Sequence, residues 1–320
     1  VGLPSAGANL NMASFIISGT AYEQFSIKSA SISVQEADTG MYYDTLTSTF
    51  SSPSGSPKWI TAAVAGFGPN YTWSVTAPVL KDNKNYNLQV TAMDLAGNVL
   101  TPPTPTVIRY DITPPVSNPT VPANNGFIKN LASLSGTAAD INSNPSGVLA
   151  TQAKIQRVND SQYWNGSTWG SETWLAASPV ALGNWTKNTQ LPPSDNVTGL
   201  QDGLAYTVQT RAYDVAGNTE PVPMAGNTFT FDVSSPTVFV TKPLNTLRFN
   251  TLTQVTGTAA DAFNVNFPQV RIYDLAVFKY WMDGSGSCGA TTLPGWVYTD
   301  CPAYPEVWNV AMDSSSVVGS

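Results

Sequence analysis

The chain has 320 residues, with 14 Lys and Arg against 21 Asp and Glu, a formal net charge of −7 and no histidine. The few basic residues are scattered, which argues against nucleic acid as a partner, because phosphate binding needs clustered Lys and Arg. Without histidine there is no Ser-His-Asp or Cys-His catalytic pair, so we expect no enzyme activity. A membrane-spanning helix is not expected either, because the sequence contains no apolar run of about 18 residues.

In chain order, the first informative element is Ser18-Gly19-Thr20-Ala21, which returns twice in similar form. It recurs around Gly136 and Gly257, at steps of 136 − 19 = 117 and 257 − 136 = 121 residues. An Asp-x-Ala-Gly-Asn segment likewise begins at Asp94 and again at Asp214. Units of this length are whole domains with their own cores. The repeat therefore predicts three tandem domains, at residues 1–113, 114–234 and 235–320.

Segments in which apolar and polar residues alternate predict β-strands. Prolines, glycines and β-branched residues interrupt every candidate helix. The alternation is clearest over residues 86–92 and 206–212. Further strands are expected at residues 14–22, 30–36, 71–77, 106–110, 153–158, 184–188, 228–231, 254–259, 269–272 and 307–311. The sequence therefore predicts an all-β fold of tandem β-sandwiches.

The Asp-x-Ala-Gly-Asn segment directly follows the alternating strand and predicts a tight hairpin. Asp bonds local backbone amides in such a turn, and Gly takes a positive φ. The final strand of each of the first two repeats ends at Asp111 or Asp232, and prolines follow. Because prolines stiffen a junction, we expect the sandwiches to form an extended array.

Two leucine–tyrosine pairs with equal spacing carry a family resemblance. Leu80 precedes Tyr86 as Leu200 precedes Tyr206, and both tyrosine strands lead into Asp-x-Ala-Gly-Asn. The pattern resembles the bacterial immunoglobulin-like and fibronectin-type-III-like repeats of large secreted and cell-surface proteins, adhesins included. The resemblance covers the first two repeats fully and the third in part. It implies immunoglobulin-like β-sandwiches, an extracellular or cell-surface location, and a tyrosine hydroxyl bonded back to the preceding corner.

The third repeat is expected to be incomplete within this chain. Trp73 precedes Tyr86 by 86 − 73 = 13 residues, and Trp185 precedes Tyr206 by 206 − 185 = 21. The matching Trp308 would place the third tyrosine at 308 + 13 = 321 to 308 + 21 = 329, past the last residue. The last two strands would then come from a longer parent chain or from another subunit.

Aromatic residues gather at equivalent places in the three repeats, each time in an expected hairpin insertion. Exposed rings beside Asn and Asp suit stacking on sugars or a protein contact, whereas rings packed on the sandwich are the structural alternative. A ligand surface, if present, is expected at Tyr43, Trp59, Tyr163, Trp164, Trp169, Trp174, Tyr280, Trp281 and Trp296.

Aspartates recur near the expected domain ends. Carboxylates of neighbouring domains could hold Ca²⁺ and stiffen a junction, as in the cadherin-like arrays that these repeats resemble, or they could be satisfied by backbone amides in turns. The aspartates near domain ends are Asp94, Asp111, Asp140, Asp214, Asp232 and Asp261, and the candidate ligands among them are Asp111, Asp140, Asp232 and Asp261. No other cofactor is expected.

The two cysteines, Cys288 and Cys301, flank an aromatic-rich segment in the third repeat. A disulfide across a hairpin insertion is the expected arrangement, with free thiols as the alternative. A disulfide would imply an oxidising compartment. The chain itself is expected to be a mature or excised piece of a longer protein.

Together these features predict a structural and adhesive section of a bacterial extracellular protein, built from spacer domains with aromatic hairpins for lateral contacts. Its partners would be neighbouring domains, other copies of itself, or a surface glycan or protein. One alternative is a self-assembling filament subunit whose third sandwich is completed in trans. Another is a carbohydrate-binding accessory module of a secreted enzyme. Oligomeric state tests the first alternative and glycan binding tests the second.

Overall fold

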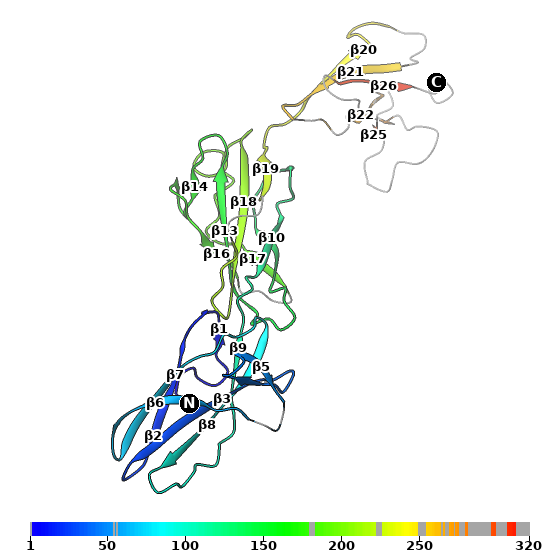
Figure 1. Ribbon diagram of the computed structural model, residues 1–320. Helices are drawn as coiled ribbons and strands as arrows, with labels where there is room; N and C mark the ends of the chain where they lie inside the picture. The colour runs from blue at the N-terminus through cyan, green and yellow to red at the C-terminus, as the bar shows by residue number, and fades with distance from the viewer. Residues whose placement is uncertain are drawn as a thin grey trace. The chain divides into compact units, whose positions relative to one another are not determined.

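The computed structural model describes residues 2–53, 55, 57–178, 183–221, 226–248, 254–263, 265, 269–271, 273–274, 279–280, 296–298 and 306–311. Strands and turns make up this part of the chain, which confirms the all-β prediction. None of these residues belongs to a helix long and apolar enough to cross a membrane. The chain divides into two compact units, Val1–Phe231 and Asp232–Ser320 (Figure 1).

The first unit begins with a β-sandwich made by nine strands, the first sandwich. One layer contains β2 and β7, and the other contains β1, β9, β8 and β3, with β4 and β5 at its side. The sixth strand belongs to both layers, because residues 60–62 pair with β3 and residues 63–67 pair with β7. The strands are β1 (Asn9–Leu10), β2 (Ile16–Tyr22), β3 (Ile27–Glu36), β4 (Tyr42–Asp44), β5 (Thr49–Ser52), β6 (Ile60–Phe67), β7 (Asn70–Thr76), β8 (Lys84–Asp94) and β9 (Thr106–Tyr110).

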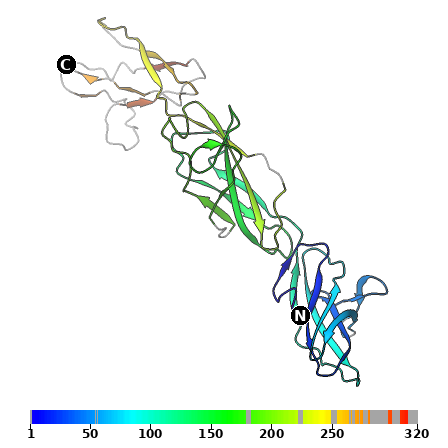
Figure 2. The same ribbon diagram turned by 90° about the vertical axis from the view of Figure 1, so that its left-hand side faces the viewer.

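The second sandwich follows in the same unit. Its smaller layer has the order β10-β12-β17, and its larger layer has the order β11-β19-β18-β13-β14-β15, with β16 beside β13. This sandwich is the mostly green part of the ribbon in Figure 2. In both sandwiches the strand at one edge of the larger layer runs parallel to the last strand of that sandwich. These parallel pairs are β1 with β9 and β11 with β19. The strands are β10 (Val116–Val121), β11 (Gly126–Ile128), β12 (Leu134–Ala139), β13 (Val148–Arg157), β14 (Tyr163–Trp164), β15 (Trp169–Gly170), β16 (Leu175–Ala176), β17 (Asn184–Lys187), β18 (Ala205–Asp214) and β19 (Asn227–Phe231).

Each sandwich has its own core, formed by the inward faces of both layers. On β18 buried and half-buried residues alternate along the whole strand, as expected for a strand with one face in the core. The fully buried large side chains include Ile32, Tyr86 and Leu88 in the first core. Those of the second core include Trp185, Tyr206, Phe229 and Phe231.

The two core tyrosines close the corner that precedes their strands. The Tyr86 hydroxyl accepts the Lys81 N–H at 2.8 Å and donates to the Lys81 carbonyl at 3.2 Å. The Tyr206 hydroxyl accepts the Gln201 N–H at 2.8 Å. Burial raises the pKa of both phenols above the usual value of 10.0. The hydrogen bonds expected from the tyrosine spacing are therefore present in both sandwiches.

The described residues of the second unit form a three-stranded sheet, β20-β21-β26, and two strand pairs. Within the sheet Gly257 lies opposite Trp308, as Gly19 lies opposite Trp73 and Gly136 opposite Trp185. This register confirms the predicted match of Trp308, while the domain boundaries at 113 and 234 stay predictions. The strands are β20 (Thr237–Lys242), β21 (Gln254–Ala260), β22 (Gln269–Arg271), β23 (Tyr273–Asp274), β24 (Lys279–Tyr280), β25 (Trp296–Tyr298) and β26 (Glu306–Ala311).

Candidate functional site

Three carboxylates converge where β9 ends and the second sandwich begins. Asp111 directly follows β9, Asp140 follows β12, and Asp214 is the last residue of β18. One oxygen from each carboxylate lies within 4.8 Å of the others. Asp111 and Asp214 are 0% exposed, and among the described residues no Lys or Arg forms an ion pair with any of the three. We call these three residues the junction carboxylates.

Asp111 is held by donors from the second sandwich. Its Oδ1 accepts the Asn142 side-chain amide at 2.9 Å, and its Oδ2 accepts the Ser146 N–H at 2.7 Å. Its backbone carbonyl accepts the side-chain amide of Asn218 at 2.8 Å. The end of the first sandwich is therefore hydrogen-bonded to two loops of the second.

Asp140 and Asp214 are held by their own loops. Asp140 Oδ2 accepts the Gly147 N–H at 2.9 Å, and the Asp214 carboxylate accepts the N–H and the side-chain amide of Asn218, both at 2.7 Å. Burial raises the pKa of Asp140 above 3.8, and the neighbouring carboxylates Asp111 and Asp214 act in the same direction against the Gly147 amide. The ionised form of Asp140, which adds a negative charge beside Asp111 and Asp214, is therefore disfavoured.

The junction carboxylates allow two chemical interpretations. Carboxylate and carbonyl oxygens are the ligands that Ca²⁺ prefers, and a cation would relieve the repulsion between like charges. Alternatively, the amide and hydroxyl donors of the surrounding loops satisfy these carboxylates without an ion. The hydrogen-bonded junction exists under both interpretations.

The sequence alone predicts only part of this cluster. Asp111 and Asp140 were expected as ligands, whereas Asp214 was recognised only as a turn residue near a domain end. The other two expected ligands lie in the second unit. There Asp232 Oδ1 accepts the Ser234 N–H and hydroxyl, and Asp261 Oδ1 accepts the Phe263 N–H. Calcium binding at any of these positions stays a prediction.

The aromatic residues of the second repeat pack on their own sandwich. Trp164 is 2% exposed, and its indole N–H donates to the Gln190 carbonyl at 2.8 Å. The half-buried Trp169 donates to the Gly199 carbonyl at 3.0 Å and packs edge-on against Trp164. Its ring also contacts Tyr206, 5.5 Å away between centroids.

Two cations bind the remaining rings of this hairpin region. Lys154 lies 5.3 Å from the ring centroid of Tyr163 and 4.7 Å from that of Trp174. Arg211 lies 4.3 Å from the Trp174 centroid. Lys154 also forms a 2.6 Å ion pair with Glu172. These contacts tie the hairpin to the sheet of β13 and β18.

In the first repeat, the half-buried Tyr43 packs edge-on against Phe50, whose ring contacts Tyr86. Trp59 is half-buried and lines a shallow surface groove with Met93 and Leu100. In the third repeat, Tyr280 belongs to β24 and Trp296 to β25. Trp281, Cys288 and Cys301 lie outside the described residues, so the expected disulfide stays a prediction.

Comparisons with known proteins give similarity of fold only. No protein-family model matches the chain, and no curated protein matches its sequence. The fibronectin(III)-like modules of Clostridium thermocellum CbhA are 14% identical over 72% of this chain and 92% of theirs, with a TM-score of 0.34. The FN1–FN3 domains of chicken CNTN1 are 12% identical over 96% of this chain and 89% of theirs, with a TM-score of 0.32.

An immunoglobulin-domain complex is also similar in structure. The complex of Dpr2 Ig1–Ig2 with DIP-Theta Ig1–Ig3 is 10% identical over 99% of this chain and 90% of the compared chain, with a TM-score of 0.29. These similar structures are fibronectin-type-III-like and immunoglobulin-like domains. The assignment of β-sandwiches rests on the strand pairing of the chain itself.

Proposed function

We propose that this chain is a structural and adhesive section of a bacterial extracellular or cell-surface protein, in which tandem immunoglobulin-like sandwiches act as spacers. The observation that carries the proposal is the fixed junction between the first two sandwiches. Asp111 is 0% exposed and accepts hydrogen bonds from Asn142, Ser146 and Asn218 of the second sandwich. A spacer needs a junction that resists bending, and a buried junction residue with satisfied hydrogen bonds provides it.

The first sandwich holds the same junction from its own side. The Asp82 carboxylate accepts the Ile112 N–H at 2.8 Å and the Thr113 hydroxyl at 2.5 Å. Arg109 on β9 donates to the Pro145 carbonyl of the second sandwich at 2.6 Å. The residues between the two sandwiches are therefore bonded on both sides, and this supports limited bending between them.

A non-catalytic role belongs to the same proposal. The chain has no histidine, and the carboxylates of Asp94, Asp195 and Asp214 accept hydrogen bonds from their own turns. In the second repeat Trp164 and Trp169 use their indole N–H groups on their own sandwich, which supports a packing role for those rings. The alternative of a carbohydrate-binding module would require other aromatic residues to carry the contact.

The stiffness of the junction can be measured in the full chain. Spin labels would replace Ile16 on β2 and Leu149 on β13, which are 53% and 61% exposed, with Cys288 and Cys301 changed to Ser. We expect a narrow distribution of distances between the labels in pulsed electron spin resonance. Asp111→Ala should broaden it, whereas Asp232→Ala, beyond the second sandwich, should leave it unchanged. A broad distribution in the parent protein would contradict the spacer proposal.

Adhesion needs a separate measurement. Beads coated with the full chain should be retained on a panel of surface glycans and extracellular proteins, at a level above beads coated with an unrelated β-sandwich. Retention by one partner class would identify the adhesive target. Equal retention of both kinds of bead, together with a narrow label distribution, would leave a spacer without adhesive function.

A further inference from the structure

The repeated Gly-Thr-Ala segment lies on β12 in the second repeat and on β21 in the third. In each of these repeats the first strand, β10 or β20, pairs with the edge of that strand. In the second sandwich β10 pairs with β12, with Ser117 opposite Ala138 and Asn118 opposite Thr137. In the second unit β20 pairs with β21 in the same register, with Val238 opposite Ala259. The covered alanines Ala138 and Ala259 are each only 2% exposed.

In the first sandwich the equivalent strand is β2, and only its beginning is covered. Leu3 pairs with Ser18 through two backbone hydrogen bonds of 2.9 and 3.1 Å, as Val121 pairs with Ser135 in the second sandwich. The Gly2 N–H also donates to the Ser18 carbonyl at 2.7 Å. Leu3 thus pairs with one side of β2 in the same register in which β10 pairs with β12.

Further along β2 this side has no strand partner among the described residues. The opposite side of β2 pairs with β7. Hydrogen-bonding groups alternate between the two sides of a strand, so the N–H and C=O groups of Thr20 and Tyr22 point to the same side as those of Ser18. Ala21 is half-buried, in contrast to its equivalents in the other repeats.

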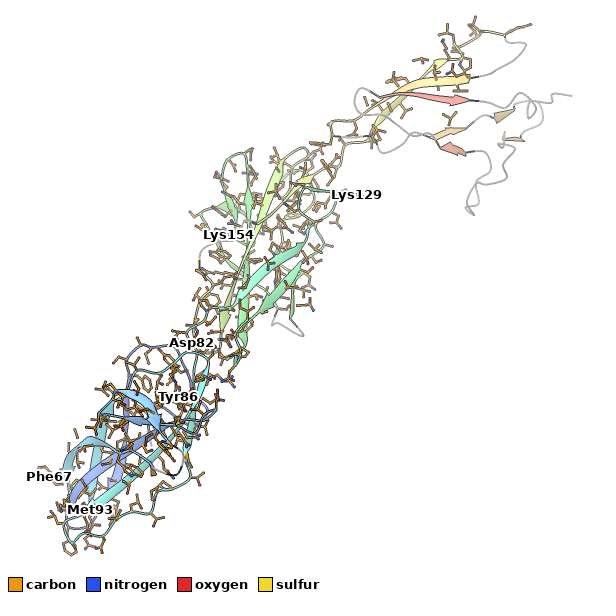
Figure 3. All side chains as sticks on the ribbon, turned by 45° about the vertical axis from the view of Figure 1, so that its right-hand side comes forward. Phe67, Asp82, Tyr86, Met93, Lys129 and Lys154 are labelled. Atoms are coloured by element: carbon orange, nitrogen blue, oxygen red, sulfur yellow. The ribbon has the colours of Figure 1, made fainter. Side chains whose placement is uncertain are left out.

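A groove of about 490 Å³ lies beside this uncovered edge. Its lining includes Thr20 and Ala21 from β2, Trp73 from β7, and Ala92 from β8. Met93 also lines the groove, and Figure 3 shows it at the same end of the first sandwich as Phe67. The groove therefore occupies the place that β10 fills in the second sandwich.

We propose that this groove binds an extended peptide strand that runs antiparallel to residues 20–22 and continues the pairing begun by Gly2 and Leu3. The occupant is joined in cis, ahead of these two residues. Their hydrogen bonds to Ser18 already set its direction and register. A strand donated by another molecule would have to end where this pairing begins.

The floor of the groove specifies the chemistry of that strand. In the second sandwich Ser117 donates its N–H to Glu220 at 2.8 Å and its hydroxyl to the same carboxylate at 2.5 Å. The place of Glu220 is taken in the first sandwich by Leu100, because both residues donate their N–H to the alanine opposite, Ala212 or Ala92. An apolar side chain lies where a buried carboxylate would otherwise bind the serine.

The occupant should therefore carry an apolar residue at the position of Ser117. Val238 holds that position in β20. A buried serine hydroxyl beside Leu100 would lack its acceptor, which costs free energy. The strand chemistry of β20, and not that of β10, fits the groove of the first sandwich.

A graft tests this directly in the full chain. The six residues 234–239, Ser-Ser-Pro-Thr-Val-Phe, would be placed ahead of Val1, which puts the grafted Val opposite Ala21. Hydrogen exchange followed by mass spectrometry over residues 16–25 is the readout. We expect the Thr20 and Tyr22 amides to exchange at least about tenfold more slowly, and the thermal midpoint of the first sandwich to rise.

Two matched grafts separate pairing from simple extension. In one, prolines replace the grafted Thr and Phe, whose N–H groups would bond to Tyr22 and Thr20, and we expect no protection. In the other, Ser replaces the grafted Val, and we expect weaker protection than with Val. Equal protection by all three grafts, or by none, would overturn the proposal.

A labelled free peptide of residues 234–243 identifies the source of the strand. If the Val graft protects Thr20 and Tyr22 and also blocks binding of the free peptide, strand completion in cis is supported. If the free peptide binds the ungrafted chain and protects both amides while the graft does not, the strand comes from another molecule and the proposed linkage is wrong.

Discussion

Gly136 lies directly against the indole ring of Trp185, so that a Cβ added at the glycine would stand 2.5 Å from Cζ2 of the ring. The same relationship joins Gly19 and Trp73, at 2.7 Å. Contact this close leaves no room for any side chain. The recurring glycine of the repeat therefore lets a large indole lie flat on the neighbouring strand.

We expect Gly136→Ala to lower the free energy of unfolding by about 1–3 kcal/mol, because the buried ring and the Asn118 carbonyl of β10 would both have to move. Gly19→Ala should cost less, since the three atoms nearest to its added Cβ all belong to the Trp73 ring and none to the backbone. Denaturant unfolding followed by tryptophan fluorescence measures both. Gly170→Ala is the control, because a Cβ there meets nothing within 4 Å. Equal stability of the Gly136 and Gly170 variants would contradict the packing argument.

Removing a core tyrosine hydroxyl should destabilise its sandwich. Tyr86→Phe leaves the Lys81 N–H and carbonyl without their shared partner, and we expect a loss of about 1–3 kcal/mol in chemical denaturation. Tyr22→Phe is the matched control, because Tyr22 is 74% exposed and should tolerate the change. If both variants unfold at the parental midpoint, the corner hydrogen bonds do not stabilise the sandwich.

Calcium should stabilise the chain if the junction carboxylates bind it. Ligand that binds only the folded state raises the free energy of unfolding by RT ln(1 + [L]/Kd). We expect millimolar Ca²⁺ to raise the thermal midpoint relative to EDTA, and Asp214→Asn to abolish the rise. Asp232→Asn lies outside the cluster and should keep it. Identical melting in Ca²⁺ and EDTA would show that hydrogen bonds alone satisfy these carboxylates.

Acid should weaken the loop that precedes the Tyr206 corner. The Thr198 hydroxyl, with the N–H groups of Val197 and Gly199, holds the pKa of Asp195 well below its usual value of 3.8. A depressed folded-state pKa contributes stability above the unfolded pKa, and this is lost as pH falls toward the folded value. Asp195→Asn should therefore be less stable than the parent at neutral pH, with the difference closing below about pH 4. A difference that does not change with pH would rule out this linkage.

Local spacing was enough to predict the features that lie within one repeat. The tyrosine corner and the match of Trp308 to Trp185 both follow from residues a fixed distance apart along equivalent strands. The alternation of apolar and polar residues did not predict β6. This strand changes layers between residues 62 and 63, so its buried face does not follow one period. Alternation also did not predict β10, an edge strand interrupted by Pro119.

The candidate site was harder to predict because it depends on distant segments. Asp214 joins Asp111 and Asp140 only when the hairpin after β18 folds against the end of β9, 214 − 111 = 103 residues away in sequence. Asn142 and Ser146 were missed because nothing in a polar loop reveals that it binds a junction. The burial of Trp164 could not be read from composition either, since an aromatic hairpin residue can face its own sandwich or the solvent.

Each sandwich pairs one of its first two strands in parallel with its last strand, and this has a mechanical consequence. In the first sandwich Asn9 and Leu10 lie beside Arg109 and Tyr110, and the second sandwich repeats this arrangement between β11 and β19. When a chain is pulled from its two ends, two strands paired in parallel are loaded in shear, so their hydrogen bonds bear the load together and do not open one at a time. Tension along the chain therefore loads these two short ladders in shear, one in each sandwich.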